Sequence, residues 1–296
     1  MSGKIQHLQT QAATPSYRRV HFSLRHRFIA SLSRVMQNQT YTVRHGLIKG
    51  MKRQGGLGFL PSLLARSTES TPEARFLAGL ALGDVVYDIG ALEGVLTLFF
   101  ALRARRVVAY EPNPASRRKL ETNLRLNHLT NVVVRDVAVG NREGLLSLIY
   151  DELMPGGATG DASVSDQIGS TSTATRSFQA AVVRLDDDIA RHGLPVPGFI
   201  KIHIEGMELA ALQGMQRTLL RRPPLYLEMH GTTMDEKERN VLRIVEFLWE
   251  AGYRRLLHIE SGTEVHPGRC SAAREGHLYC SAPPGSASLD RTGGHE

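Results

Sequence analysis

Five carboxylates and two histidines follow short apolar runs, at positions where the strands of an open α/β sheet would end. They are Asp88, Glu111, Asp136, Glu205 and Glu228, with His203 and His230. In such sheets ligands bind beyond the carboxyl ends of the strands. We therefore expect these side chains to gather at one edge of a sheet and to include the residues that carry the chemistry.

Residues 84–94 predict a strand that turns through two glycines into a helix. Gly90 and Gly94 would let the backbone pass close to a ligand, where a side chain would collide. Their Gly-x-x-x-Gly spacing differs from the Gly-x-Gly-x-x-Gly that seats a pyrophosphate. Asp88 and Glu93 would repel a pyrophosphate and suit a ligand with an ammonium or sulfonium group. A plain strand–helix turn without a ligand is the alternative.

Glu111 ends the next apolar run, 23 positions after Asp88. An acid at about this distance holds the ribose hydroxyls in dinucleotide-binding folds. A ribose acceptor without a pyrophosphate loop indicates a nucleoside ligand such as S-adenosylmethionine.

Residues 199–206 alternate between isoleucines and ionisable side chains, so that Lys201, His203 and Glu205 would share one face of a strand. A central parallel strand is normally apolar on both faces. The ionisable face therefore indicates a reaction centre, with a wet edge strand as the alternative.

Residues 225–231 repeat this pattern, with Glu228 and His230 on one face. If the two strands are neighbours, these two residues with His203 and Glu205 could form a site with two histidines and two carboxylates for a divalent metal. No ligand motif supports such a site, so we assign no metal and take the four residues as catalytic candidates.

The surrounding pattern predicts a doubly wound α/β fold. Thr71-Pro72 and Asn113-Pro114 are typical helix starts. Apolar strand segments and amphipathic helices alternate from residue 84 to about residue 250, and a closing strand pair is expected over residues 253–259 and 277–280. Residues 154–177, rich in small and polar residues, predict a substrate cover or a passive insertion.

The basic charge of the chain is concentrated at its N-terminus. Residues 1–70 hold 11 of the 36 Lys and Arg but one of the 29 acids, and the whole chain carries +7. We expect a basic extension over residues 1–70, helical between 17 and 43 with a loop near 50–61, a main domain over 71–282 and a disordered tail over 283–296. The extension could meet nucleic acid, anionic lipid or an acidic partner, or be a solvated surface. It carries no recognisable nucleic-acid-binding motif.

Other features of the sequence favour a cytoplasmic protein. No segment approaches the roughly 20 apolar residues of a membrane span. The polar, basic N-terminus does not predict a secretory signal. Cys270 and Cys280 are the only cysteines and offer neither metal-type spacing nor a disulfide framework.

Five motifs occur in an order and spacing that resemble the FkbM-type family of S-adenosylmethionine-dependent methyltransferases, over roughly residues 75–250. The motifs are Asp88-Ile89-Gly90, Tyr110-Glu111-Pro112-Asn113-Pro114, Asn123-Leu124-x-x-Asn127, Ile200-Lys201-Ile202-x-Ile204-Glu205-Gly206-Met207-Glu208 and Leu227-Glu228-x-His230.

The resemblance implies a mostly parallel, seven-stranded class I methyltransferase sheet of Rossmann-like form, with its last strand antiparallel. It also implies S-adenosylmethionine as cofactor and methyl transfer to a hydroxyl oxygen. The candidate cofactor-binding residues are Asp88, Gly90, Glu93 and Gly94 at the methionine end, Glu111 at the ribose and Asp136 near the adenine.

The chain departs from the family pattern at two positions. Leu92 stands where the first motif usually has Asn, and His203 replaces the Asp of the fourth-strand motif. With an unperturbed pKa of about 6.5, a histidine can act as a base at neutral pH. The leading hypothesis is thus O-methylation of a hydroxyl on a small molecule or sugar. The alternative is a non-catalytic protein on the same fold that binds the cofactor or a partner. A nucleic-acid methyltransferase is disfavoured because the motif of amino-methylating enzymes is missing.

Overall fold

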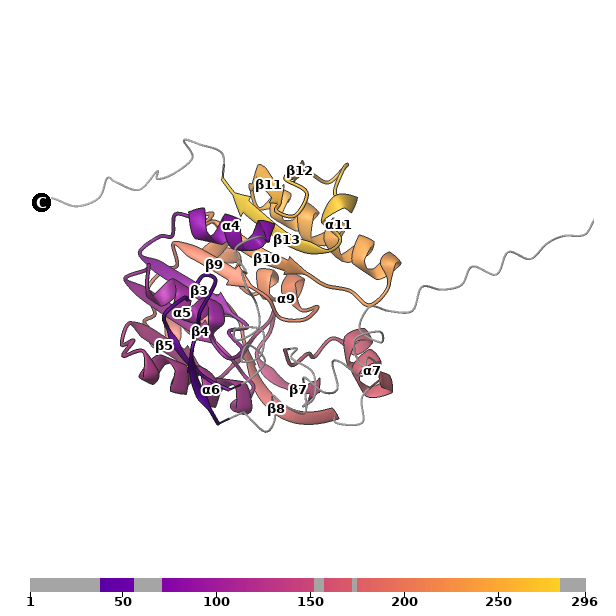
Figure 1. Cartoon of the computed structure of the whole chain (residues 1–296). Coiled ribbons are helices and arrows are strands. Elements are labelled where there is room, and N and C mark those ends of the chain that lie inside the picture. The colour runs from indigo at the N-terminus through magenta and orange to yellow at the C-terminus, as the bar shows by residue number, and fades with distance from the viewer. Residues whose placement is uncertain (1–37, 56–70, 152–156, 172–174, 283–296) are drawn as a thin grey trace, which may run out of the picture.

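The computed structural model describes residues 38–55, 71–151, 157–171 and 175–282 (Figure 1). Its centre is a mixed sheet of eight strands in the order β12-β11-β13-β10-β9-β3-β4-β5. The bounds of these strands are β3 Val85–Ile89, β4 Arg106–Tyr110, β5 Val132–Arg135, β9 Phe199–Ile202, β10 Leu225–Met229, β11 Arg255–His258, β12 Thr263–Val265 and β13 Gly276–Ser281.

The strands β5, β4, β3, β9 and β10 run parallel, and β13 is antiparallel to β10. Since β11 is in turn antiparallel to β13, it points the same way as the parallel strands. The expectation of a mostly parallel sheet with an antiparallel last strand is therefore confirmed. The expected count of seven is wrong by one, because the short strand β12 pairs with β11 at the edge.

Helices cover both faces of this sheet, as the doubly wound pattern predicts. The helices are α4 Pro72–Gly79, α5 Val95–Ala101, α6 Pro114–Leu126, α8 Leu185–His192, α9 Glu208–Gln213, α10 Gln216–Leu219 and α11 Met234–Glu250, and a 3-10 turn, η1, spans Ser271–Ala273.

Alternate residues of each central strand pack into two separate cores. Tyr87 of β3 lies in a core with Leu212 and Leu248, whereas Val86 lies in the other core with Phe100 and Leu120. All these side chains are fully or almost fully buried. The central strands are thus apolar on both faces and are fixed in place by helices on each side.

Two helix starts have the capping groups that the sequence indicates. The Thr71 hydroxyl accepts a hydrogen bond from the N–H of Ala74, and the Asn113 side chain accepts one from the N–H of Ala115. Each cap is followed by a proline at the first helical position, whose missing N–H costs nothing there. The Thr71 cap begins α4 ahead of β3, and the Asn113 cap begins α6 directly after β4.

A second sheet of three strands lies beside the first. It has the order β6-β8-β7, and its bounds are β6 Ala138–Val139, β7 Gly144–Asp151 and β8 Thr175–Val183. Helix α7, Ala162–Thr171, stands between β7 and β8 in the chain. Regular structure thus occupies much of the segment 154–177 that was expected to be irregular, although residues 154–156 and 172–174 lie outside the described residues.

The N-terminal expectations need correction where they can be compared with the structure. Residues 40–42 form a strand, β1 Thr40–Thr42, rather than the end of a helix, and β2 Lys52–Gln54 replaces part of the expected loop. The two strands pair as an antiparallel hairpin. The expected helix over residues 17–37, the rest of the loop over 56–61 and the C-terminal tail lie outside the described residues.

Two further elements are shorter than predicted. Strand β9 ends at Ile202, so His203 and Glu205 lie on the loop beyond it rather than on its face. The apolar spacing of Leu209, Leu212, Met215 and Leu219 predicts one helix after this loop, but the structure has two, α9 and α10. The break is at Gly214, where a Cβ would lie 1.9 Å from the carbonyl oxygen of Gly140. None of the described helices is long and apolar enough to cross a membrane.

Candidate active site

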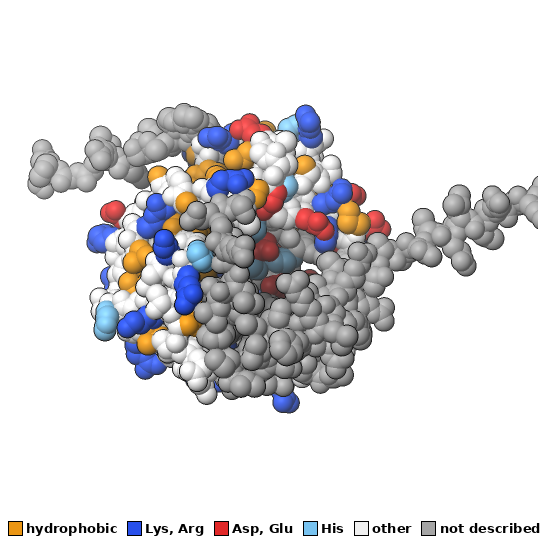
Figure 2. All heavy atoms as spheres, viewed as in Figure 1, with side chains coloured by type: hydrophobic (Ala, Val, Ile, Leu, Met, Phe, Trp, Pro, Cys, Tyr) orange, Lys and Arg blue, Asp and Glu red, His pale blue; other side chains and the backbone are white. Residues whose placement is uncertain are grey.

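A cavity of about 590 Å³ opens at the carboxyl ends of β3, β4 and β9. This is the crevice in which open α/β sheets bind ligands, and the volume is in the range of small-molecule sites. Figure 2 shows acidic and histidine side chains gathered in the hollow at the centre of this face. The ionisable residues of the wall include Arg53, Glu93, Glu111, His203, Glu205, Glu228 and His277.

Gly90 is required by the packing of two strand ends. Its φ is +82°, and a Cβ there would lie 1.9 Å from the carbonyl oxygen of His203. The end of β3 and the loop after β9 can therefore meet only through a glycine. Gly94 has a φ of +87°, and a Cβ there would lie 2.4 Å from Leu120, so this residue serves the packing of α5 on α6. Gly90 lines the cavity and Gly94 does not.

Asp88 lies beneath the glycine turn, away from the cavity wall. It is fully buried, its Oδ1 lies 2.8 Å from Lys201 Nζ, and its Oδ2 accepts a hydrogen bond of 2.6 Å from Thr97. Lys201 also donates to the carbonyl oxygen of Gly90 over 2.6 Å. The pair thus ties the end of β9 to the turn after β3.

Glu93 lies on the cavity wall, but its charge is already compensated. Its two oxygens lie 2.9 Å from Arg53 Nη2 and 2.7 Å from Lys119 Nζ. Since Asp88 is paired as well, the interpretation that two free acids of this turn face the ligand is wrong. Each acid has a cationic partner from another part of the chain.

Glu111 lies on the wall at the end of β4 and is 5% exposed. Its oxygens accept hydrogen bonds from the N–H groups of Leu92, at 2.6 Å, and Asn113, at 2.8 Å. Burial raises the pKa of this carboxyl to about 7, although the two N–H donors and Lys201 act in the opposite direction. Each oxygen keeps a second lone pair for a ligand hydroxyl.

Asp136 is exposed and is not among the residues that line the cavity. The three residues after it, Val137, Ala138 and Val139, line the wall instead. The apolar run therefore continues past Asp136 into the site. The part of the wall that would contact a ring system such as adenine is apolar.

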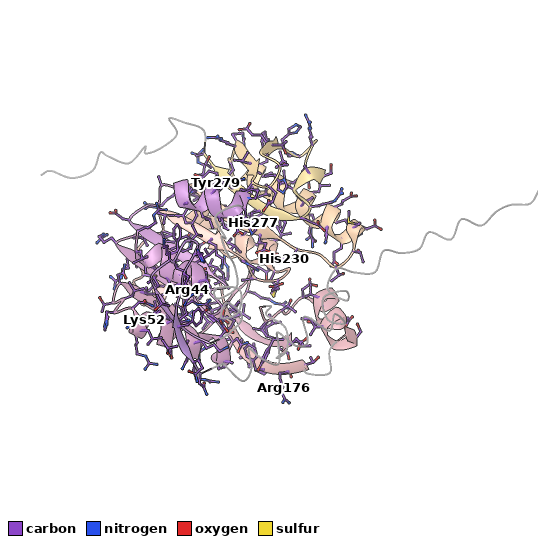
Figure 3. All side chains as sticks on the ribbon, in the orientation of Figure 1. Arg44, Lys52, Arg176, His230, His277 and Tyr279 are labelled. Carbon is purple, nitrogen blue, oxygen red and sulfur yellow. The ribbon has the colours of Figure 1, made fainter. Side chains whose placement is uncertain are left out.

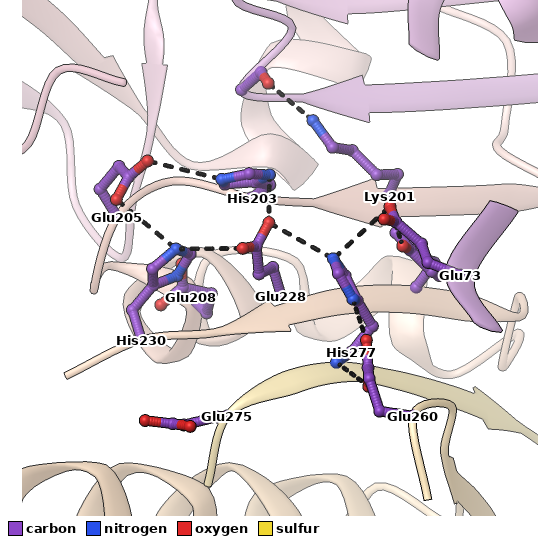
Figure 4. A network of polar contacts seen from close by, with 12 residues as sticks. Glu73, Lys201, His203, Glu205, Glu208, Glu228, His230, Glu260, Glu275 and His277 are labelled. Carbon is purple, nitrogen blue, oxygen red and sulfur yellow. Dashed lines mark hydrogen bonds and ion pairs between the residues drawn. The ribbon is translucent and has the colours of Figure 1, made fainter. Parts of the chain in front are cut away.

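The four catalytic candidates come together in a closed ring of alternating acids and histidines (Figure 4). His203 Nδ1 lies 2.5 Å from Glu228 Oε2, and His203 Nε2 lies 3.4 Å from Glu205 Oε1. His230 Nε2 closes the ring, at 3.5 Å from Glu205 Oε2 and 3.9 Å from Glu228 Oε1. The expectation that these side chains converge is met, because β9 and β10 are neighbouring strands.

The loop after β9 presents this ring through an unusual backbone conformation. Glu205 has a φ of +53°, in the left-handed region, and its carbonyl oxygen accepts a hydrogen bond of 2.7 Å from Thr159. Its side chain accepts a weaker bond of 3.2 Å from the N–H of Gly157. Non-glycine residues in this region are uncommon and gather at functional sites.

A second layer of side chains holds the ring in place. Glu208 is 2% exposed, and its Oε1 lies 2.9 Å from His230 Nδ1 and accepts bonds from the N–H groups of Ile204 and Gly206. On the opposite side, His277 Nε2 lies 3.5 Å from Glu228, and its Nδ1 lies 2.6 Å from Glu260.

The carboxylates set the protonation of the histidines. Burial alone lowers the pKa of His230, but the hydrogen bond to Glu208 and the charges of Glu208, Glu205 and Glu228 outweigh it and raise the pKa to about 9. The pKa of His277 is raised to about 9 in the same way, by Glu228 and Glu260. His230 and His277 thus carry protons at neutral pH.

His203 differs from the other two histidines because it lies on the cavity wall between two carboxylates. Burial and the charge of Lys201 lower its pKa, while the bonds to Glu205 and Glu228 and the charge of Glu228 raise it, with a net rise. Burial raises the pKa of Glu228, but the hydrogen bonds from His203 and His277 and the charges of His203 and His230 hold it far below its ordinary value. An imidazolium at this position is therefore well stabilised.

Atoms of His203, Glu228 and His230 lie within 4.8 Å of one another, close enough to hold a metal ion. The neighbouring-strand condition for the metal alternative is thus met. All three side chains are already engaged in the acid–histidine ring, and we interpret the cluster as a hydrogen-bonded network.

Sequence reasoning missed four residues of the site. Glu208 lies within a motif and could have been noticed as an acid near the ring. Lys201 was recognised as ionisable but not as the partner of Asp88. His277 and Arg53 come from segments without a local signal, since only the pairing of β13 with β10 and the docking of the hairpin bring them to the cavity.

Comparison with known proteins gives matches in sequence and structure. Residues 88–255 match the model of the methyltransferase FkbM domain, which is more than half of the chain. The chain is 28% identical over 157 residues to the 31-O-demethyl-FK506 methyltransferase FkbM of Streptomyces tacrolimicus, which covers 45% of this chain and 60% of that protein. It is 25% identical over 143 residues to Methyltransferase 1 of Beauveria bassiana (strain ARSEF 2860), covering 44% and 57%.

The matched stretches span less than two thirds of either relative's length. Among solved structures, methyltransferase FkbM from Methylobacillus flagellatus KT aligns with 21% identity and a TM-score of 0.44, over 69% of this chain and 45% of that one. On the strength of the domain match over residues 88–255, this chain belongs to the methyltransferase FkbM domain family.

Proposed function

We propose that this protein is an S-adenosylmethionine-dependent methyltransferase that transfers a methyl group to a hydroxyl oxygen of a small molecule or sugar. The family supports methyl transfer, and the Streptomyces tacrolimicus relative is named for methylation at the 31-O position of FK506. The observation that carries the proposal is that Glu111 and His203 stand on the walls of one cavity.

The residues of the cavity fit the proposed cofactor. Glu111 has a free lone pair on each oxygen for the two ribose hydroxyls, and the apolar stretch of Val137 to Val139 suits a flat base. The loop after Gly90 has no cluster of unpaired cations for a pyrophosphate among the described residues. When bound, S-adenosylmethionine supplies an electrophilic methyl group.

The ring of acids and histidines would accept the proton of the acceptor hydroxyl. The neutral form of His203 is the base, and its imidazolium would be stabilised by Glu228 at 2.5 Å and Glu205 at 3.4 Å. General-base help of this kind is typically worth about 10²–10⁴-fold. Orientation of acceptor and donor in the cavity supplies the rest, since positioning alone reaches effective molarities of about 10⁵–10⁸ M.

Calorimetry of the full chain with S-adenosylmethionine tests the proposal, with NAD as the comparator. We expect micromolar binding of S-adenosylmethionine, no binding of NAD, and loss of binding in Glu111→Ala. Hydroxylated small molecules and sugars would then be screened for methylation. Absence of S-adenosylmethionine binding by the intact protein would contradict the enzyme function.

The second candidate is a non-catalytic protein that binds the cofactor or a partner on the same fold. One observation favours this candidate: His203 occupies the position at which the FkbM-type pattern usually has an aspartate. The two candidates differ in the outcome of substitutions at His203, because only a catalytic base is needed for turnover.

A further inference from the structure

The N-terminal hairpin contributes an arginine to the cavity. Arg53 of β2 is 5% exposed and is part of the cavity wall. Its Nη1 donates to the Tyr41 hydroxyl over 3.3 Å and its Nη2 to Glu93 over 2.9 Å. Its Nε is buried and has no hydrogen-bond partner among the described residues. A guanidinium has five N–H donors, and a buried donor without an acceptor is costly.

Two asparagines hold the hairpin in the position that brings Arg53 to the cavity. Asn127 accepts a bond of 2.8 Å from the N–H of Lys52 and donates one of 2.7 Å to its carbonyl oxygen. Asn123 accepts a bond of 2.8 Å from the N–H of Gln54 and donates one of 2.8 Å to the carbonyl oxygen of Glu93. Asn123 of α6 and Asn127, which caps the C-terminus of α6, thus bond to the backbone of β2.

The charges on this part of the wall do not cancel. Arg53 and Lys119 both contact Glu93, so two cations share one carboxylate and leave one positive charge in excess. Arg53 and Glu93 are both more than nine-tenths buried, where solvent screens charges weakly, whereas the Lys119 side chain is 29% exposed. A ligand in the cavity with a single carboxylate would supply the missing charge and an acceptor.

We propose that Arg53 binds the carboxylate of the methionine part of S-adenosylmethionine, so that the hairpin is a component of the cofactor site. The inference rests on the proposed function, and it adds a residue outside the matched family segment of 88–255. Glu93, which lies beside the glycine turn, then positions the guanidinium instead of contacting the cofactor. One surplus charge suits one carboxylate better than the two charges of a pyrophosphate.

The test compares two probes that differ only in the carboxylate, S-adenosylmethionine and its decarboxylated form, by calorimetry on the full chain. We expect the wild type to prefer S-adenosylmethionine. In Arg53→Gln, the affinity for S-adenosylmethionine should fall about 10- to 100-fold, as for the loss of a bond to a charged group, while the affinity for the decarboxylated form stays unchanged. Lys52→Gln, which alters an exposed neighbour on the same strand (Figure 3), should change neither affinity.

Two further variants separate ligand binding from a purely structural role. In Arg53→Gln with Glu93→Gln, the preference should remain lost. If Arg53 only neutralised Glu93, this double variant would regain it, and the inference would be overturned. If melting curves show that Arg53→Gln is unfolded, Arg53→Lys takes its place, because it keeps the positive charge beside Glu93. Arg53→Lys should lower the affinity for S-adenosylmethionine several-fold and leave the affinity for the decarboxylated form unchanged.

The remaining outcomes separate a failure of the Arg53 inference from a failure of the proposed methyltransferase function. If the wild type binds both probes equally, or if Arg53→Gln weakens both alike, Arg53 does not bind the carboxylate although the cofactor proposal stands. If the wild type binds neither probe, the proposed function fails and the inference fails with it.

Discussion

His203 Nδ1 lies 2.5 Å from Glu228 Oε2, and this contact joins the loop after β9 to the neighbouring strand β10. It leaves the other ring nitrogen, Nε2, at 3.4 Å from Glu205 on the cavity wall. Both carboxylates favour the imidazolium, so His203 is arranged to take up a proton and not merely to fill space.

The first prediction concerns substitution of this histidine. In His203→Gln, kcat should fall by about 10²–10⁴-fold because the base is lost. His203→Asp should be impaired as well, since a third carboxylate beside Glu205 and Glu228 is disfavoured in its charged form. Cofactor binding measured by calorimetry should persist in both. Unchanged turnover in either variant would remove His203 from the chemistry.

The second prediction concerns the pH dependence of kcat/KM. Because the base must be neutral, kcat/KM should rise as the pH passes through the pKa of His203. Burial and the charge of Lys201 lower this pKa, but the neighbouring carboxylates outweigh them and hold it above 6.5. Glu205→Gln removes one of these charges and should move the rising limb to lower pH. Arg191→Gln, on an exposed ion pair with Glu143, is the matched control. A limb that stays in place in Glu205→Gln would show that Glu205 does not act on His203.

The third prediction concerns stability. The pKa of His230 is about 9 in the folded protein and about 6.5 in the unfolded chain. Protonated His230 therefore stabilises the fold fully below about pH 6.5, and this contribution is lost as the pH rises to about 9. Urea unfolding of the wild type should show this fall. His230→Gln should reduce the slope by up to about 1.4 kcal/mol per pH unit. His277 contributes a similar fall, so a residual slope is expected, and an unaltered slope would contradict the pairing of His230 with Glu208.

The fourth prediction concerns the contact between two strand ends. Gly90→Ala would place a Cβ against the backbone of His203 at a φ of +82°, and should lower the free energy of unfolding by at least about 2 kcal/mol. Gly79→Ala has open space around its Cβ and should change stability by no more than about 1 kcal/mol. Thermal and urea unfolding measure both, and equal effects would mean that the two strand ends can separate freely.

The fifth prediction concerns metals. His230 holds a proton at neutral pH and Glu208 occupies its Nδ1, so methyl transfer should be unaffected by EDTA. The control is dialysed enzyme with added Mg²⁺ or Zn²⁺. Loss of activity in EDTA that a divalent ion restores would instead favour a metal at His203, Glu228 and His230.

The sequence predicted the parts of this fold that depend on local patterns. The buried run of β3 and the proline caps of α4 and α6 follow from apolar spacing and turn residues, whereas the pairing of β9 with β10 entered only as a condition and is supplied by the structure. The convergence of His203, Glu205, Glu228 and His230 also follows, since strand ends meet at one edge.

The remaining features depend on contacts between distant segments. Strand β2 has three residues and no apolar pattern, and it is held by side chains of α6 some 70 positions later. The pairing of Glu93 with Arg53 and Lys119 could not be seen in a turn that contains only acids. Strand β9 ends at Ile202 and Glu205 of the following loop adopts a positive φ, neither of which the alternation of residue types reveals.

The position of β13 has a consequence for how the chain reaches this state. Among the described strands it is the last along the chain, yet it lies inside the sheet between β10 and β11, and it carries His277 to the cavity. Without residues 276–281, β10 and β11 would each present an unpaired edge that can recruit another chain. The pairing of this one strand therefore fills the gap between β10 and β11 and also brings His277 to the site.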